Sequence, residues 1–162
     1  MPASAIIHDI RLTATPAMRA LMLAEGADAR MVARAAAMFR DMHVPLMVAG
    51  TLDQAVRACA QKKPELVLLP ANAQGCRLLW QIRRGQAGAG VAGQGAAGQG
   101  PAVLALLERA EAGQIARMMA QGADECLVWP FGARLLAARV EMLTRAAAGC
   151  GGADGAGQRL AG

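Results

Sequence analysis

The sequence has few aromatic residues and no long uncharged apolar run. Tyrosine is absent, and aromatic residues make up 2% of the 162-residue chain. So few aromatic side chains argue against a β-sandwich built on aromatic pairs and against a nucleic-acid platform that stacks bases. No apolar stretch of about 18 residues lacks charge or glycine, and the chain does not begin with a basic segment followed by an apolar one. We therefore expect no membrane span and no signal peptide, and we expect a cytoplasmic location.

The chain also lacks cysteine pairs at the spacing of metal or redox sites. Its four cysteines stand far apart, and none belongs to a C-x-x-C pair. We therefore expect reduced, mostly buried thiols, no disulfide framework, and no metal or other cofactor. The net charge is +5, but all the basic residues except Lys62 and Lys63 are arginine. We attribute the excess of arginine and alanine to genomic base composition, which weakens any argument from positive charge to nucleic-acid binding.

Hydrophobic residues form 55% of the sequence and alternate between two patterns. Short continuous apolar runs indicate buried strands, and segments with apolar residues at helical spacing indicate helices that bury one face. The expected strands are 20–23, 46–49, 65–69, 102–107 and 126–128. The expected helices are 29–42, 52–62, 76–84, 111–121 and 132–147, with Thr51 as the cap of the second.

Strands that alternate with helices through short connections predict an α/β fold whose parallel sheet is covered on both faces. Right-handed crossovers leave few arrangements of five such strands. We expect a flavodoxin-like, doubly wound, five-stranded parallel sheet in the order 2-1-3-4-5, with five helices. Ligands and reacting groups of such folds lie at the carboxyl ends of the strands. The residues that follow positions 23, 69, 107 and 128 are therefore the candidates for a site.

Three segments are expected to lie outside this regular fold. Residues 1–18 are interpreted as an N-terminal extension, and the glycine-rich residues 149–162 as a disordered tail. Seven of the sixteen residues in 85–100 are glycine, which is typical of a flexible insertion. These glycines follow a helix and precede a strand, the reverse of a dinucleotide-binding loop. The single domain is therefore expected to span residues 19–148.

Three segments of the chain resemble response-regulator receiver domains, the chemotaxis-regulator-like family. They are PELVLLPANAQG (64–75), GADECLVWPF (122–131) and LLAARVEMLTR (135–145). Receiver domains typically have P-D-L-V-L-L-D in the first, G-A-D-D-F-L-x-K-P-F in the second, and a cis peptide bond before the second segment's proline. The resemblance covers roughly residues 19–147. It implies phosphoryl transfer to an aspartate that shares Mg²⁺ with an acidic pair, assisted by a hydroxyl and a lysine.

The chemical groups that this resemblance implies are missing at the matching positions. The acidic pair falls on Ala24 and Glu25, and the acceptor aspartate falls on Pro70. The hydroxyl position falls on Leu106, or on Leu107 with a one-residue shift, and the lysine position falls on Trp129. A lone glutamate does not supply the near-octahedral oxygen set that Mg²⁺ requires, and proline has no nucleophile. The sequence is therefore interpreted as a degenerate receiver, or pseudo-receiver.

Three functional interpretations follow from this comparison. The first is a non-enzymatic, phosphorylation-independent module that binds a protein partner such as a histidine kinase or another receiver, or forms a homodimer. The alternative is a sensor that binds a small apolar ligand in the vestigial acceptor pocket, bounded by Ala24, Pro70, Leu106 and Trp129. A true response regulator with a different acceptor is the third, but no aspartate lies between Asp53 and Asp124.

The resemblance also indicates a candidate interface formed by the fourth helix, the fifth strand and the fifth helix. Its residues are Arg117, Trp129, Phe131 and Arg134, since tryptophan and arginine are frequent interface anchors. Trp129 has two interpretations that the sequence leaves open. It is either an exposed anchor for a partner or a lid whose indole folds over the empty pocket.

A pair of arginines, Arg83 and Arg84, precedes the glycine-rich segment. The pair is compatible with contact to an anionic surface. Arginine near the end of a helix is also expected from the helix dipole alone, and no recognition-helix motif accompanies the pair. We therefore do not expect nucleic-acid binding.

Overall fold

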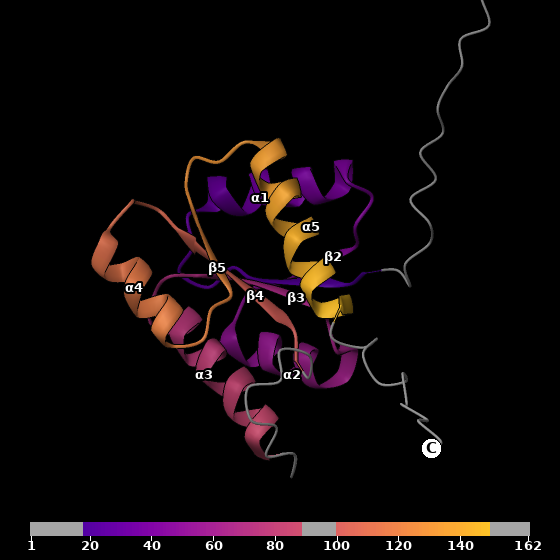
Figure 1. The fold of residues 1–162 in the computed structure, drawn as a ribbon, viewed down its shortest axis with the longest axis vertical. Helices are drawn as coiled ribbons and strands as arrows, with labels where there is room; N and C mark the ends of the chain where they lie inside the picture. Colours follow the sequence, from indigo (N-terminus) through magenta and orange to yellow (C-terminus); the bar gives the residue numbers. More distant parts are fainter. Residues whose placement is uncertain (1–17, 89–99, 150–162) are drawn as a thin grey trace, which may run out of the picture.

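A computed structural model describes residues 18–88 and 100–149 (Figure 1). The strands are β1 (Ala20–Leu23), β2 (Leu46–Ala49), β3 (Leu66–Pro70), β4 (Ala102–Leu107) and β5 (Glu125–Val128). The helices are α1 (Ala29–Asp41), α2 (Leu52–Lys62), α3 (Ala73–Gly88), α4 (Ala112–Ala120) and α5 (Ala133–Gly149). Most of the expected extension, the middle of the insertion and nearly all of the tail lie outside the described residues.

The five strands form one parallel sheet in the order β2-β1-β3-β4-β5, which confirms the predicted fold class and strand order. In the register of the central pair, Leu66 faces Ala102 and Pro70 faces Leu106. Figure 1 shows α1 and α5 on one side of the sheet and α2, α3 and α4 on the other. The carboxyl ends of the strands therefore meet at one edge, from which the loops to the helices begin.

The core consists of two apolar layers, one on each side of the sheet. Alternate strand residues point to opposite sides, so Leu66 and Leu68 contribute to the layer under α1 and α5. Val67 and Leu69 contribute to the layer under α2, α3 and α4. Because both faces are covered, all five residues of β3 are buried. This explains why the strand is a continuous apolar run rather than an alternating one.

Side-chain caps define the starts of α1 and α2. Asp28 precedes α1, and its carboxylate accepts a hydrogen bond of 2.7 Å from the Arg30 amide. Thr51 precedes α2 as predicted, and its hydroxyl accepts a hydrogen bond of 3.3 Å from the Gln54 amide. These side chains satisfy backbone donors that have no partner within the helix.

Helix α3 is longer at both ends than the sequence pattern indicated. It begins at Ala73 because Asn72 caps it, with Oδ1 accepting a hydrogen bond of 2.9 Å from the Gly75 amide. It continues to Gly88, so residues 85–88 are helical and do not belong to a flexible insertion. Glycine weakens a helix by about 1 kcal/mol relative to alanine, but the intervening Gln86 and Ala87 are good helix formers. Residues 89–99 of the expected insertion lie outside the described residues.

One further feature matches what the resemblance to receiver domains implies. The peptide bond between Trp129 and Pro130 is cis. Within the described residues, no helix is long and apolar enough to cross a membrane.

Candidate functional site at the carboxyl edge of the sheet

The structure brings Pro70 and Leu106 together at the carboxyl edge of the sheet. They face each other across β3 and β4, and the Ala71 amide donates a hydrogen bond of 2.8 Å to the Leu106 carbonyl. The Trp129 amide donates to the Leu107 carbonyl at 2.7 Å, so the loop after β5 starts at the same edge. The strand ends thus converge as the sequence analysis expected.

A hollow of about 290 Å³ lies beside this edge. It is lined by Gly26, Pro70, Ala71, Asn72, Leu106, Glu108, Arg109, Glu111 and Gln114. Two of the predicted pocket residues, Pro70 and Leu106, belong to this lining, whereas Ala24, Glu25 and Trp129 do not. The loop between β4 and α4, which follows the candidate position 107, supplies the carboxylates of Glu108 and Glu111 and the guanidinium of Arg109. The predicted apolar pocket is therefore corrected to a polar one, and the structure does not support a sensor of a small apolar ligand.

Glu25 is held away from the hollow by helix α2. Its Oε2 accepts a hydrogen bond of 2.6 Å from the Leu52 amide in the first turn of that helix. Its backbone carbonyl accepts a hydrogen bond of 3.1 Å from Nδ2 of Asn72. The single carboxylate that remains at the matched acidic pair therefore stabilises a helix start, where the dipole favours negative charge.

The end of β3 is packed tightly against the first turn of α3. A β-carbon at position 75 would lie 1.7 Å from the carbonyl oxygen of Pro70, so only glycine fits there. The backbone amide of Asn72 also donates a hydrogen bond of 2.9 Å to the Pro70 carbonyl. From α4, Nε2 of Gln114 donates a hydrogen bond of 2.5 Å to the Ala71 carbonyl. These contacts fix the loop after β3 from two helices.

Trp129 lies next to Phe131 on the side of the sheet covered by α1 and α5. The two rings meet edge to face, with centroids 5.3 Å apart and planes at 86°. Trp129 is half-buried against the core layer, and Phe131 is only 5% exposed. Phe131 is therefore a core residue, which corrects its assignment to an exposed interface. Trp129 does not belong to the lining of the hollow beside Pro70, which favours the anchor interpretation over the lid.

The two arginines of the candidate interface are exposed and come from helices on opposite sides of β5. Arg117 lies on α4 and Arg134 lies on α5. The sequence analysis missed two exposed apolar side chains on α5, Leu135 and Met142. They are seven residues apart and therefore lie on the same face of the helix. This spacing is the signal by which they could have been found.

Arg83 has a structural role rather than a role at an anionic surface. Its Nε and Nη2 donate to the Gly122 carbonyl at 2.9 and 2.7 Å, and Nη2 also contacts Oδ2 of Asp124 at 2.9 Å. The same carboxylate oxygen accepts from the Val103 amide at 2.7 Å. Arg83 therefore connects α3 to the turn after α4 and to the start of β4.

The described cysteines, Cys59, Cys76 and Cys126, are free thiols. Burial raises the pKa of Cys59 to about 11. Burial also raises the pKa of Cys126, and the neighbouring Glu125 carboxylate adds to that effect. Thiolates, not thiols, bind metals and attack electrophiles, so neither residue is suited to those tasks. Across residues 18–88 and 100–149, no three His, Cys, Asp or Glu side chains are close enough to hold a metal ion.

No family model matches the sequence, and no curated protein does. Solved structures do match the fold. The receiver domain of a putative LuxO repressor protein from Vibrio parahaemolyticus is 19% identical, with a TM-score of 0.63 over 80% of this chain and 92% of that one. The receiver domain of Klebsiella pneumoniae RstA, determined in a BeF3-activated form, is 20% identical, with a TM-score of 0.62 over 78% and 98% of the two chains.

NtrX from Brucella abortus is a longer protein. It is 19% identical with a TM-score of 0.65, and the match covers 83% of this chain but 27% of NtrX. The LuxO and RstA structures are receiver domains. The chain therefore has the receiver-domain fold, in agreement with its strand order.

Proposed function

We propose that this chain is a pseudo-receiver, a phosphorylation-independent module that acts by protein contact in two-component signalling. The observation that carries the proposal is Pro70. It ends β3 at the position that the sequence resemblance matches to the acceptor aspartate, and its carbonyl is packed against Gly75. Proline has no group that attacks phosphorus. The chain is not an enzyme on this account.

The electrostatics around Pro70 support the same proposal. Transfer from a phosphodonor requires Mg²⁺ to neutralise charge on the transferred group, and Mg²⁺ requires several oxygen ligands at fixed geometry. Glu25 is bound to the Leu52 amide. The other nearby carboxylates, Glu108 and Glu111, line the hollow together with Arg109, whose positive charge opposes cation binding. The edge of the sheet is therefore unsuited to the metal-dependent reaction.

A receiver fold that lacks its phosphorylation site can still bind a partner protein. The partner in this proposal is a cytoplasmic histidine kinase or another receiver, with which the module would compete or dock. The contact face includes Arg117, Trp129 and Arg134, extended by the exposed Leu135 and Met142 of α5. Tryptophan and arginine are enriched among interface hot spots, and methionine is enriched at interfaces.

The test is incubation of the full chain with acetyl phosphate and Mg²⁺, followed by intact mass measurement and hydroxylamine treatment. We expect no hydroxylamine-sensitive acyl phosphate. The receiver domain of Klebsiella pneumoniae RstA, treated in parallel, is the positive control for the reagent. A stoichiometric acyl-phosphate adduct on this chain would contradict the proposal, and peptide mapping would identify the acceptor.

A further inference from the structure

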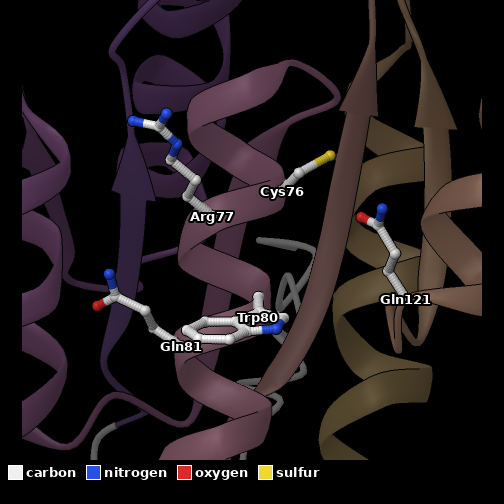
Figure 2. Close-up of a pocket in the computed structure, with 5 residues that line it drawn as sticks. All are labelled: Cys76, Arg77, Trp80, Gln81 and Gln121. Atoms are coloured by element: carbon white, nitrogen blue, oxygen red, sulfur yellow. The ribbon is translucent and has the colours of Figure 1, made fainter.

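A second hollow lies between α3 and α4. Its volume is about 550 Å³. Figure 2 shows that four lining residues, Cys76, Arg77, Trp80 and Gln81, come from α3, and that Gln121 at the end of α4 lies on the side to which Cys76 points. We call this hollow the α3–α4 groove.

Trp80 is the dominant apolar surface of the α3–α4 groove. The core side of α3 is formed by Leu78, Leu79 and Ile82, which are buried, whereas Trp80 is 56% exposed. It is the most exposed large hydrophobic residue in the described part of a chain that has only four aromatic residues. Packing of the domain therefore does not explain its position, and an exposed tryptophan beside a hollow is characteristic of a binding anchor.

The charge at the α3–α4 groove is positive. The guanidinium of Arg84 lies over the Trp80 ring at 4.3 Å from its centroid. Arg77, about one helical turn before Trp80, also lines the groove. No acidic residue belongs to the lining. The nearby carboxylate of Asp124 is already bound by Arg83 and by the Val103 amide. An occupant therefore meets an aromatic face flanked by two positive charges and by the amides of Gln81 and Gln121.

We propose that the α3–α4 groove binds an acidic peptide segment of a partner protein. An aliphatic or aromatic side chain of that segment packs on Trp80, while its carboxylates pair with Arg77 and Arg84. The net charge of +5 disfavours a second copy of this chain as the occupant. One exposed aromatic ring and two arginines also form a smaller footprint than a nucleic-acid strand requires. This proposal does not depend on the proposed function, although Arg117 of that contact face precedes Gln121 by four residues on α4.

The test is selection of a phage-displayed library of random peptides on the full chain. Selected peptides are then synthesised and titrated against the Trp129→Phe variant, in which Trp80 is the only tryptophan. We expect enriched sequences that combine several Asp or Glu residues with a central apolar one. Their binding should change the Trp80 fluorescence and weaken as salt is added, because exposed charge pairs are screened.

Variants decide whether the α3–α4 groove is the site. Trp80→Ala and the double variant Arg77→Glu with Arg84→Glu should each weaken binding by at least about ten-fold. Arg34→Glu, which changes an exposed arginine of α1 on the other side of the sheet, is the matched control and should bind as the wild type does. Absence of enrichment, or peptides that bind these groove variants equally well, would overturn the proposal. A dimer that Trp80→Ala dissociates in sedimentation would also overturn it, because a second copy would then be the occupant.

Discussion

At the scale of single residues, the contact between Pro70 and Gly75 determines how α3 sits on the sheet. The Gly75→Ala substitution would place a β-carbon 1.7 Å from a backbone oxygen that belongs to a buried strand. Neither partner is a flexible side-chain end that can move aside. We expect the free energy of unfolding, measured by urea denaturation, to fall by about 2–4 kcal/mol.

Gly85→Ala is the matched control for that substitution. Gly85 lies inside α3, and nothing is within 4 Å of the β-carbon that alanine would add. Alanine is favoured over glycine in a helix interior, so we expect the unfolding free energy to rise by about 0.5–1 kcal/mol. If both variants changed stability equally, the close packing at Pro70 would not be as described.

The Cys59 thiol provides a second test at this scale. Burial raises its pKa to about 11, so almost none of it is thiolate near neutral pH. We expect alkylation of Cys59 by iodoacetamide, followed by peptide mass mapping, to be slow at pH 8 and to accelerate about ten-fold per pH unit toward pH 11.

The same pKa gives stability a defined pH dependence. The thiol ionises in the unfolded chain near its ordinary value and in the folded chain at about 11. Above the unfolded pKa the unfolded state binds fewer protons than the native state, so stability falls as pH rises between these two values. The Cys59→Ser variant should show a smaller fall. An identical alkaline decrease in both proteins would mean that Cys59 is not the group responsible.

At the scale of secondary-structure elements, Arg83 joins α3 to α4 and β4. Arg83→Met removes the hydrogen bonds to the Gly122 carbonyl and to Asp124, and leaves both acceptors without that partner. Loss of charge-assisted, partly buried hydrogen bonds predicts a decrease of about 1–3 kcal/mol in the unfolding free energy. Arg84→Met is the control, since its guanidinium lies over the exposed Trp80 and should change stability by less than about 0.5 kcal/mol.

A variant of Glu25 tests whether its carboxylate caps the start of α2 or binds a metal ion. Glu25→Ala leaves the Leu52 amide without its acceptor, and we expect the unfolding free energy to fall by about 1 kcal/mol. The decrease should be the same with and without millimolar Mg²⁺ in thermal or urea unfolding. Stabilisation by Mg²⁺ that disappears in the variant would show that Glu25 is a metal ligand.

Most elements were predictable because their patterns are local. The continuous apolar run of β3 and the capping by Thr51 follow from neighbouring residues, and both were found. Helix α3 was predicted too short because its first turn depends on Asn72, which caps the helix and also binds the Glu25 backbone 47 residues earlier. Contacts over such distances are invisible to periodicity.

At the scale of the whole molecule, the topology could be predicted but the surface could not. Five alternating strand and helix patterns leave few arrangements, and the observed strand order is the one predicted. Phe131 was assigned to an interface although its ring is buried, since sequence spacing does not show which layer a loop residue enters. Trp80 was not singled out, because its exposure depends on how α3 packs against the sheet.

The central claim is that the carboxyl edge of the sheet no longer binds the magnesium and phosphoryl groups of a receiver. The most direct test is a titration of the isotope-labelled chain with Mg²⁺ and then with BeF3, followed by the amide resonances of Gly26, Ala71 and Asn72. We predict no saturable shift of these resonances, whereas the RstA receiver domain from Klebsiella pneumoniae should respond. Saturable shifts centred on the loop after Pro70 would contradict the account.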